Sequence, residues 1–242
     1  MDTSFRISST AHPDSPLAAS CQLLVVEADD WASTTAELQR FARESIDSDW
    51  QAVGKAIPVS LGRSGLAWGI GLHGETGGAA PRKREGDGCA PAGIFAITEL
   101  FGTAPPNSDF ASHLHLPYRQ ATPDIVAVDD PASAHYNRII DRRQVPAPDW
   151  QSHEEMLRDD ERYVVGAFIA HNSPQPVPGA GSCIFLHVWQ APGVPTAGCT
   201  AGSLDEIREI CQWLDGAAAP LLVQLPRSEF ARCGIAIADI IS

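Results

Sequence analysis

The sequence predicts a mainly β protein with a few peripheral helices. Several segments of strand length are rich in Val, Ile, Leu, Phe and Trp. The 20 glycines and 19 prolines are frequent enough to place turns between these segments. Signals for the start of a helix are few. Many short strands joined by Gly- and Pro-containing turns are typical of a β architecture, and 242 residues are enough for one large β domain.

Six segments are predicted to be strands because apolar and β-branched side chains dominate them. They are residues 22–28 (QLLVVEA), 66–72 (LAWGIGL), 93–97 (GIFAI), 162–170 (RYVVGAFIA), 184–189 (IFLHVW) and 221–225 (LLVQL). The first of these is apolar on both faces, which predicts a strand that is buried on both sides.

Helices are predicted where a Ser or Thr is followed three positions later by Glu, since this pair can cap a helix N-terminus. The three such pairs are Thr34 with Glu37, Ser152 with Glu155 and Ser203 with Glu206. After the first pair, Leu38 and Phe41 supply an apolar face at helical spacing. The third pair precedes the best helical pattern, formed by Leu204, Ile207, Ile210, Cys211 and Leu214.

One domain with a short N-terminal arm is the predicted organisation. Residues 1–20 are rich in Ser, Thr, Pro and Ala and predict a flexible arm, and residues 21–242 are predicted to form a single domain. Residues 74–93 form a Gly-rich loop. Residues 102–149 have little periodicity, and a region this long and irregular is typically either functional or disordered. Within it, four polar residues are candidates to roof a cleft or to cap loops: Asp129, Asp130, Tyr136 and Asn137.

The charge balance argues against nucleic-acid binding. The formal net charge is -13, whereas phosphate neutralisation needs clustered Lys and Arg. The single tight basic cluster is the triplet Arg82-Lys83-Arg84. No run approaches the roughly 18 apolar residues of a membrane helix, so an integral membrane segment is not expected.

The metal-ligating residue types are spaced unfavourably for a metal site. The six cysteines form no CxxC pair. His113 and His115 have the spacing of two ligands on one strand, yet they have no third candidate nearby and are interpreted as exposed loop histidines. No metal or organic cofactor is therefore expected.

The densest group of reactive residue types lies between residues 171 and 203. His187 lies inside the predicted strand 184–189, and Cys199 follows after eleven intervening residues on a Gly-flanked turn. A nearby imidazole can take the proton of a thiol, and the N-terminus of the helix predicted after Ser203 also favours the thiolate. Gly198 allows close backbone approach, and amides beside Cys199 can bind an oxyanion. Packed cores also contain such cysteines and histidines, so the pair alone does not establish catalysis.

Two motifs in this order resemble the L,D-transpeptidase catalytic domain, the YkuD-like family. The turn Thr196-Ala197-Gly198-Cys199 resembles the family's Ser/Thr-x-Gly-Cys turn, with a His on the strand ahead of it. The segment 83–95 (KREGDGCAPAGIF) resembles the family's Lys-x-Gly-Asp segment. The similarity covers about residues 60–226. It implies the family's β-sandwich-like catalytic fold with peripheral helices.

The resemblance also implies an activity in peptidoglycan biosynthesis. Cys199 would attack the bond between the diamino acid and D-Ala of a tetrapeptide stem, with His187 as base and the amides of Gly198 and Cys199 as oxyanion donors. The thioester would then pass to an amine acceptor. Stem peptides are the expected partners and carbapenems are candidate inhibitors. No cofactor is implied, and the oligomeric state is not predicted.

Further residues are candidates for substrate binding or for support of the pair. Lys83 and Arg84 could hold stem carboxylates, or could form a solvated loop, and Asp87 could brace that loop. His171 could orient His187 or line the cleft, and Ser182 could donate a hydrogen bond to the imidazole. Thr196 and Ala197 belong to the catalytic turn.

Departures from the family pattern leave other functions open. Ala197 stands where the family usually has His, and Ala201 stands where a basic residue or Asn is usual. Both put in doubt how the substrate is held. A cysteine hydrolase or L,D-carboxypeptidase would use the same residues with water as acceptor. A non-catalytic module that binds wall peptides would keep only the fold.

The expected location also has two readings. The resemblance implies the bacterial cell envelope or periplasm. The N-terminal residues show no signal-peptide pattern, which leaves a cytoplasmic acyl transfer open.

Overall fold

The computed structural model describes residues 6–7, 15–75, 79–233, 235 and 237–238. The protein is mainly β with few helices, as the sequence predicts. Eight strands form a closed ring, because the last strand of the sheet pairs back with the first. In order around the ring they are β11 (Val165–Ile169), β12 (Phe185–Val188), β13 (Thr200–Gly202), β4 (Gln51–Ser60), β3 (Thr35–Ala42), β2 (Gln22–Ala28), β14 (Leu221–Pro226) and β6 (Ala90–Gly102).

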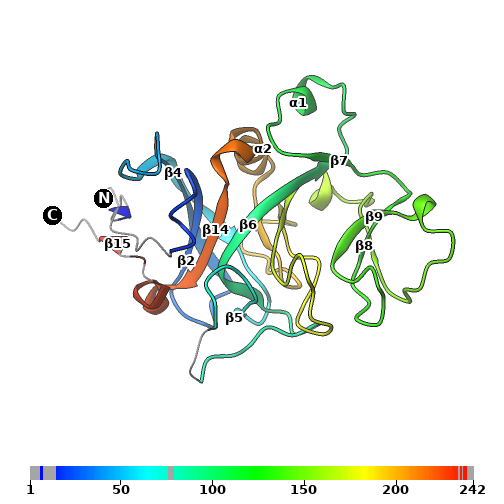
Figure 1. Cartoon of the computed structure of the whole chain (residues 1–242), viewed down its shortest axis with the longest axis horizontal. Helices are drawn as coiled ribbons and strands as arrows, with labels where there is room; N and C mark the ends of the chain where they lie inside the picture. Colours follow the sequence, from blue (N-terminus) through cyan, green and yellow to red (C-terminus); the bar gives the residue numbers. More distant parts are fainter. Residues whose placement is uncertain (1–5, 8–14, 76–78, 234, 236, 239–242) are drawn as a thin grey trace.

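Ring closure depends on the length of β6. This 13-residue strand pairs with β14 through its first half and with β11 through its second half. Two short strands, β5 (Leu66–Trp68) and β7 (Tyr118–Gln120), also pair with β6. The sheet is therefore one closed, barrel-like layer (Figure 1).

Two smaller sheets accompany the ring. The first is formed by β8 (Ile125–Val128), β9 (Arg138–Asp141) and β10 (Glu154–Glu155), all from the region between β7 and β11. Figure 1 shows β8 and β9 on the side of the molecule opposite β2. The second sheet pairs β1 (Arg6–Ile7) with β15 (Ile237–Ala238) and joins the two ends of the chain.

The helices are short and peripheral. The α-helices are α1 (Asp109–Ser112) and α2 (Leu204–Trp213), and the 3₁₀ turns are η1 (Arg142–Gln144), η2 (Glu161–Tyr163), η3 (Gly216–Ala218), η4 (Arg227–Glu229) and η5 (Ala231–Cys233). The predicted cap of α2 is confirmed, since Ser203 Oγ accepts from Glu206 N at 3.4 Å. Within the described residues no helix is long and apolar enough to cross a membrane.

Two of the predicted helices are wrong. The segment after Thr34 is strand β3, paired with both β2 and β4. The pairing of β3 with β4 shifts register between Leu38 and Arg40. Because of this shift, Leu38 and Phe41 both point into the larger core although they are three residues apart. The segment after Ser152 contains strand β10 rather than a helix. In both places sheet pairing overrides the local capping signal.

The predicted strands exist with shifted ends. The prediction for β2 has the observed bounds, and residues 93–97 lie inside β6. The predicted strand 66–72 ends at Trp68, and the strand 162–170 begins only at Val165, after the turn η2.

The predicted flexible arm is wrong for its last residues. Leu17 is buried, and the Arg43 guanidinium donates to the carbonyls of Leu17, Ala18 and Ser20 at 2.7–2.8 Å. Residues 6–7 belong to β1. The rest of the arm, residues 1–5 and 8–14, lies outside the described residues.

Two apolar cores flank the ring strands. The larger core includes Leu186 and Val188 of β12. The smaller core lies between the ring and the β8–β9–β10 sheet and contains Phe185, Tyr163, Cys183 and Cys199. Alternation along β12 therefore turns Phe185 and His187 to the face opposite Leu186 and Val188, toward the small sheet.

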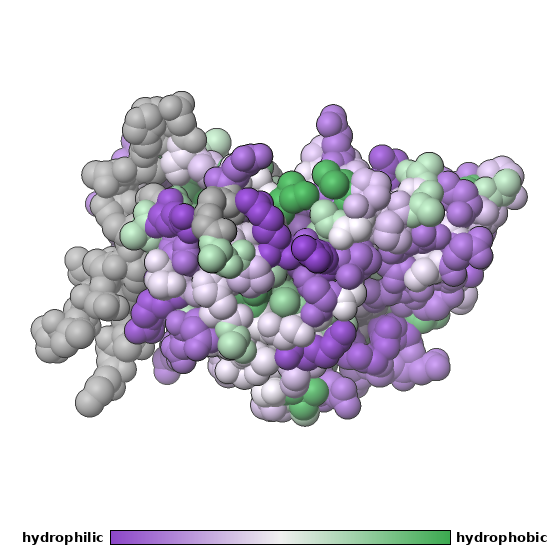
Figure 2. Space-filling model, turned by 90° about the horizontal axis from the view of Figure 1, so that it is seen from below, coloured by the Kyte–Doolittle hydropathy of each residue, from purple (hydrophilic) through white to green (hydrophobic). Residues whose placement is uncertain are grey.

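The outer surface shown in Figure 2 is largely hydrophilic, with small separate hydrophobic patches. The exposed large hydrophobic residues of the described chain are Ile46, Ile70, Leu72, Leu157, Val177 and Val194. Scattered residues of this kind are normal for a protein surface. Val194 is the one among them that borders the cavity described next.

Candidate active site

Cys199 and His187 line the same cavity, whose volume is about 260 Å³. Four residues singled out from the sequence meet here, because Thr196 and Ala197 also contribute to the lining. The remaining lining residues are Glu154, Arg158, Arg162, Tyr163, Trp189, Gln190, Val194 and Pro195. The cavity lies where the face of β12 that carries His187 approaches the small sheet.

Two parallel strands place Cys199 and His187 at one cavity, where the Cys199 thiol also donates to the Cys183 carbonyl at 3.6 Å. In the pairing of β12 with β13, Leu186 is opposite Thr200 and His187 is opposite Ala201. Cys199 immediately precedes β13, so it lies beside Phe185, two residues before His187. The Phe185 N–H donates to Cys199 Sγ at 3.3 Å, which fixes the sulfur against the strand that carries the imidazole.

The turn formed by residues 196–199 is held by the Thr196 hydroxyl. Thr196 Oγ1 donates to the Cys199 carbonyl at 2.7 Å and accepts from Gly198 N at 3.0 Å. Gly198 has φ +155, and a Cβ there would lie 3.0 Å from the Cys89 carbonyl oxygen. Glycine is therefore required at this position. The expectation that the Gly198 amide binds an oxyanion is corrected, since that N–H already has a partner.

The imidazole of His187 has a defined tautomer. Its Nδ1 lies 2.8 Å from the carbonyl oxygen of Val188, and a carbonyl only accepts, so Nδ1 carries the proton. Nε2 is left with its lone pair, which a general base needs. The ring packs edge-to-face on Tyr163, with centroids 5.3 Å apart at 76°.

Burial keeps both groups neutral. Desolvation raises the pKa of Cys199 to about 12, and the negative charge of Glu154 adds to this effect. Desolvation lowers the pKa of His187 to about 4, reinforced by the cations Arg162 and Arg158. The resting site thus holds a thiol and a neutral imidazole. This corrects the expectation of a resting thiolate, because desolvation is the largest influence on the pKa of Cys199.

Four cavity residues that carry charges or a phenol group are not singled out by the sequence: Glu154, Arg158, Arg162 and Tyr163. Tyr163 Oη donates to Glu154 Oε2 at 2.5 Å. Arg158 and Arg162 both hydrogen-bond Asp160, at 3.1 Å and at 2.5–2.9 Å. These bonds hold the pKa of Asp160 well below its usual range. The charged run 158–162 directly before a strand was the available signal.

His171 does not reach the candidate site. Its Nδ1 accepts from Ile70 N at 3.2 Å and its Nε2 donates to the Ala180 carbonyl at 3.0 Å. The residue is fully buried and packs on Phe95. The proposed role in orienting His187 is wrong, because both ring nitrogens are committed elsewhere.

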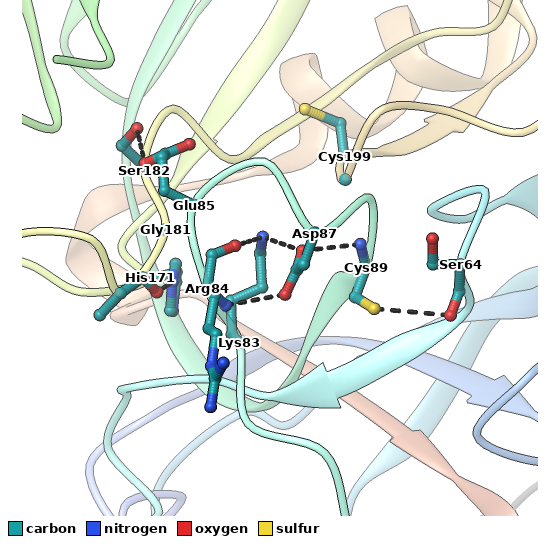
Figure 3. A network of polar contacts seen from close by, with 12 residues as sticks. Ser64, Lys83, Arg84, Glu85, Asp87, Cys89, His171, Gly181, Ser182 and Cys199 are labelled. Carbon is teal, nitrogen blue, oxygen red and sulfur yellow. Dashed lines mark hydrogen bonds and ion pairs between the residues drawn. The ribbon is translucent and has the colours of Figure 1, made fainter. Parts of the chain in front are cut away.

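Ser182 is also bonded away from the imidazole. Its hydroxyl donates to Glu85 Oε2 at 2.7 Å, and the Tyr136 hydroxyl donates to the same oxygen. The expected hydrogen bond from Ser182 to His187 is therefore wrong. Figure 3 shows Ser182 and Glu85 side by side, apart from Cys199.

The segment 83–89 braces a loop instead of binding in the cavity. Asp87 accepts from Lys83 Nζ at 2.6 Å, from Arg84 N at 2.7 Å and from Cys89 N at 2.9 Å. The Lys83 side chain is only 4% exposed, and the Arg84 guanidinium points away from Cys199 in Figure 3. Asp87 has the bracing position predicted for it. The expectation that Lys83 and Arg84 hold carboxylates beside Cys199 is corrected, since neither lines the cavity.

The candidate roof residues act as loop ties. Asn137 donates to the carbonyls of His171 and Asn172, both at 2.8 Å, and accepts from Cys183 N at 2.9 Å. Asp130 accepts from two backbone amides, and Asp129 accepts from Ser152. None of these lines the cavity. Of the described residues, no group of three His, Cys, Asp or Glu could hold a metal ion.

No protein-family model, no curated protein and no solved structure matches this chain.

Proposed function

We propose that the protein is a cysteine acyltransferase that acts on peptidoglycan stem peptides as an L,D-transpeptidase. The observation that carries the proposal is that Cys199 and His187 line one cavity, with His187 Nε2 left as the basic nitrogen. The order of the two sequence motifs supplies the substrate class. The family's catalytic fold and the cell-envelope location belong to the same proposal.

Acylation begins from neutral groups. As the thiol attacks the carbonyl carbon between the diamino acid and D-Ala, its proton moves to His187 Nε2. The hydrogen bond from His187 Nδ1–H to the Val188 carbonyl stabilises the resulting imidazolium. The tetrahedral intermediate then collapses, the C–N bond breaks, and the imidazolium returns the proton to the departing amine of D-Ala. A charged His187 therefore forms only while the substrate is reacting with Cys199.

The oxyanion requires donors that are not already engaged. Because the Gly198 amide donates to Thr196, we assign the backbone N–H of Cys199 to the oxyanion. The Thr196 hydroxyl donates to the Cys199 carbonyl. This hydrogen bond fixes the turn that carries both the Cys199 sulfur and the Cys199 amide.

The cavity size and its cations suit the end of a peptide. About 260 Å³ accommodates a terminal residue rather than a whole stem. Arg158 and Arg162 at the cavity wall can pair with the terminal carboxylate of D-Ala. They take the place that we expected for Lys83 and Arg84.

Water as the acceptor gives the alternative function, an L,D-carboxypeptidase. The same pair, cavity and arginines serve both reactions, so the acceptor alone separates them. The second alternative is a module that binds wall peptides without turnover. It is favoured by Ala197, which stands where the family usually has His.

Release of D-Ala tests the proposal. Purified tetrapeptide stems are incubated with the protein and with Cys199→Ala, and products are identified by mass spectrometry. The proposal predicts release by the wild type and none by the variant. A carbapenem is predicted to label Cys199 covalently. A protein that binds stems but neither releases D-Ala nor reacts with a carbapenem is the binding module.

A further inference from the structure

The cavity contains charges of both signs. Arg158 and Arg162 contribute two guanidinium groups, and Glu154 contributes a carboxyl group beside Cys199 and His187. The arginines are already paired with Asp160, an acid that does not line the cavity. Glu154 is instead held by Tyr163 Oη, which donates to only one of its two oxygens, Oε2.

Strand pairing directs Glu154 into the cavity. In the antiparallel pairing of β10 with β8, Glu154 is opposite Ala127, which packs in the smaller core together with Cys199. The next residue, Glu155, therefore points the other way. Its side chain is 50% exposed and pairs with Arg142. Adjacent residues of the same type thus have different environments.

We propose that Glu154 is the specificity residue that receives the acyl acceptor, a cationic primary amine, and so directs the thioester toward amide formation rather than hydrolysis. This inference rests on the proposed acyl transfer by Cys199. A carboxylate inside a cavity attracts an ammonium group more strongly than it attracts water. The acceptor carries a positive charge and the donor carries a terminal carboxylate. The acceptor is therefore matched to Glu154, and the donor is matched to Arg158 and Arg162.

Proton transfer during the second step can be balanced with these groups. The ammonium gives one proton to the Glu154 carboxylate and becomes a nucleophile. Its nitrogen attacks the thioester carbonyl carbon, and the C–S bond breaks. The second proton passes to His187 Nε2 and then to the sulfur. The products are an amide, the Cys199 thiol and a protonated Glu154, which returns its proton to solvent.

Burial makes Glu154 suited to this proton. Desolvation raises the pKa of its carboxyl above the ordinary value, while the hydrogen bond from Tyr163 opposes the shift. A carboxylate with a raised pKa is a stronger base toward an ammonium group. The groups that face it across the cavity are Tyr163, Arg158, Arg162, His187 and Cys199.

Partition of the acyl-enzyme tests the proposal. The wild type, Glu154→Gln and the control Glu155→Gln are supplied with a tetrapeptide stem and with Nα-acetyl-lysine amide as acceptor. Mass spectrometry follows the acyl-enzyme, the amide product and the hydrolysed product. Glu154→Gln is expected still to form the acyl-enzyme, and among the acyl-enzyme that forms the ratio of amide to hydrolysed product falls about tenfold or more, the size of a lost charged contact. Glu155→Gln is expected to keep the wild-type ratio.

A neutral nucleophile distinguishes the proposed role from a structural one. Hydroxylamine is uncharged near pH 7, so Glu154→Gln should transfer the acyl group to it as well as the wild type does. Glu154→Asp, which keeps the charge, should restore part of the transfer to the lysine derivative. An unchanged amide-to-hydrolysis ratio in Glu154→Gln, or an equal loss with hydroxylamine, would overturn the inference. If the wild type forms no acyl-enzyme, the proposed function itself fails.

Discussion

The backbone N–H of Phe185 donates to the sulfur of Cys199 at 3.3 Å. This contact joins the strand that carries His187 to the turn that carries the thiol. It also favours the thiolate slightly, yet burial dominates and the pKa of Cys199 stays near 12. The sulfur is thus positioned while it is still protonated.

The rate at which Cys199 is alkylated should reflect its protonated resting state. Since the thiol is protonated at neutral pH, its reaction with iodoacetamide is expected to be slow at pH 7 and to rise about tenfold for each pH unit up to pH 10. Peptide mapping by mass spectrometry after timed quenching measures the rate at Cys199 alone.

The buried Cys211 provides the control for this measurement. Burial raises the pKa of its thiol to about 12 as well, and it does not line the cavity. Labelling of both cysteines at one rate would report unfolding. A Cys199 rate that is constant between pH 5 and pH 8 would reveal a resting ion pair with His187 and would contradict the neutral site.

The Thr196 hydroxyl is predicted to be needed for fast acylation. Thr196→Val removes the hydrogen bonds to the Cys199 carbonyl and from the Gly198 amide. We expect the rate of acyl-enzyme formation to fall about 10- to 100-fold, which corresponds to roughly 1.4–3 kcal/mol in the barrier. Thr196→Ser keeps the hydroxyl and should stay within about threefold of the wild type. Equal rates for all three proteins would remove Thr196 from the account.

Loss of the Asp87 brace should destabilise the fold. In Asp87→Asn the buried Lys83 ammonium loses its counter-charge, while the Asp87 side chain is 20% exposed, which moderates the loss. We expect the free energy of unfolding to drop by about 1–3 kcal/mol in urea titrations. Glu209→Gln breaks the more exposed pair with Arg40 and should cost less than about 1 kcal/mol. A brace that costs no more than this control would contradict the assignment.

Stability is predicted to decrease as the pH falls from about 6.5 to about 4. Burial lowers the pKa of His171 and of His187 to about 4, so both stay neutral in the folded protein. In the unfolded chain the two histidines titrate near 6.5. Between pH 6.5 and pH 4 the unfolded chain therefore binds more protons than the folded protein, and the unfolded state is stabilised relative to the folded one. The loss is on the order of 3 kcal/mol per histidine at the lower end.

Other groups titrate in the same window, so the test compares variants. His171→Gln should flatten the pH dependence of the unfolding free energy between pH 6.5 and pH 4. His113→Gln, whose side chain is 68% exposed, should leave it unchanged. If His171→Gln retains the full wild-type slope, the buried neutral imidazole does not contribute as described.

Part of the fold could be predicted because its signals are local. Strand β2 is apolar along its whole length, and the cap of α2 combines Ser203 with a helical apolar pattern. Strand β3 was mistaken for a helix because a register shift in the pairing with β4 gives Leu38 and Phe41 a helical spacing. The shift depends on a partner strand, which local periodicity does not reveal.

The candidate site could be predicted only in part for the same reason. Cys199 and His187 are recognisable by residue type and motif. Glu154 is one of two adjacent glutamates in a charged segment, and only the pairing of β10 with β8 decides which of them enters the cavity. Lys83 and His171 looked functional by type, but tertiary contacts commit Lys83 to Asp87 and His171 to backbone groups.

The most direct test of the account is the mass of the protein during turnover. The wild type is mixed with a tetrapeptide stem, quenched in acid within seconds and analysed intact and after digestion. The account predicts a thioester-linked tripeptide adduct on the peptide that contains Cys199, and none in Cys199→Ala. D-Ala release without an adduct on Cys199, or an adduct on another residue, would contradict it.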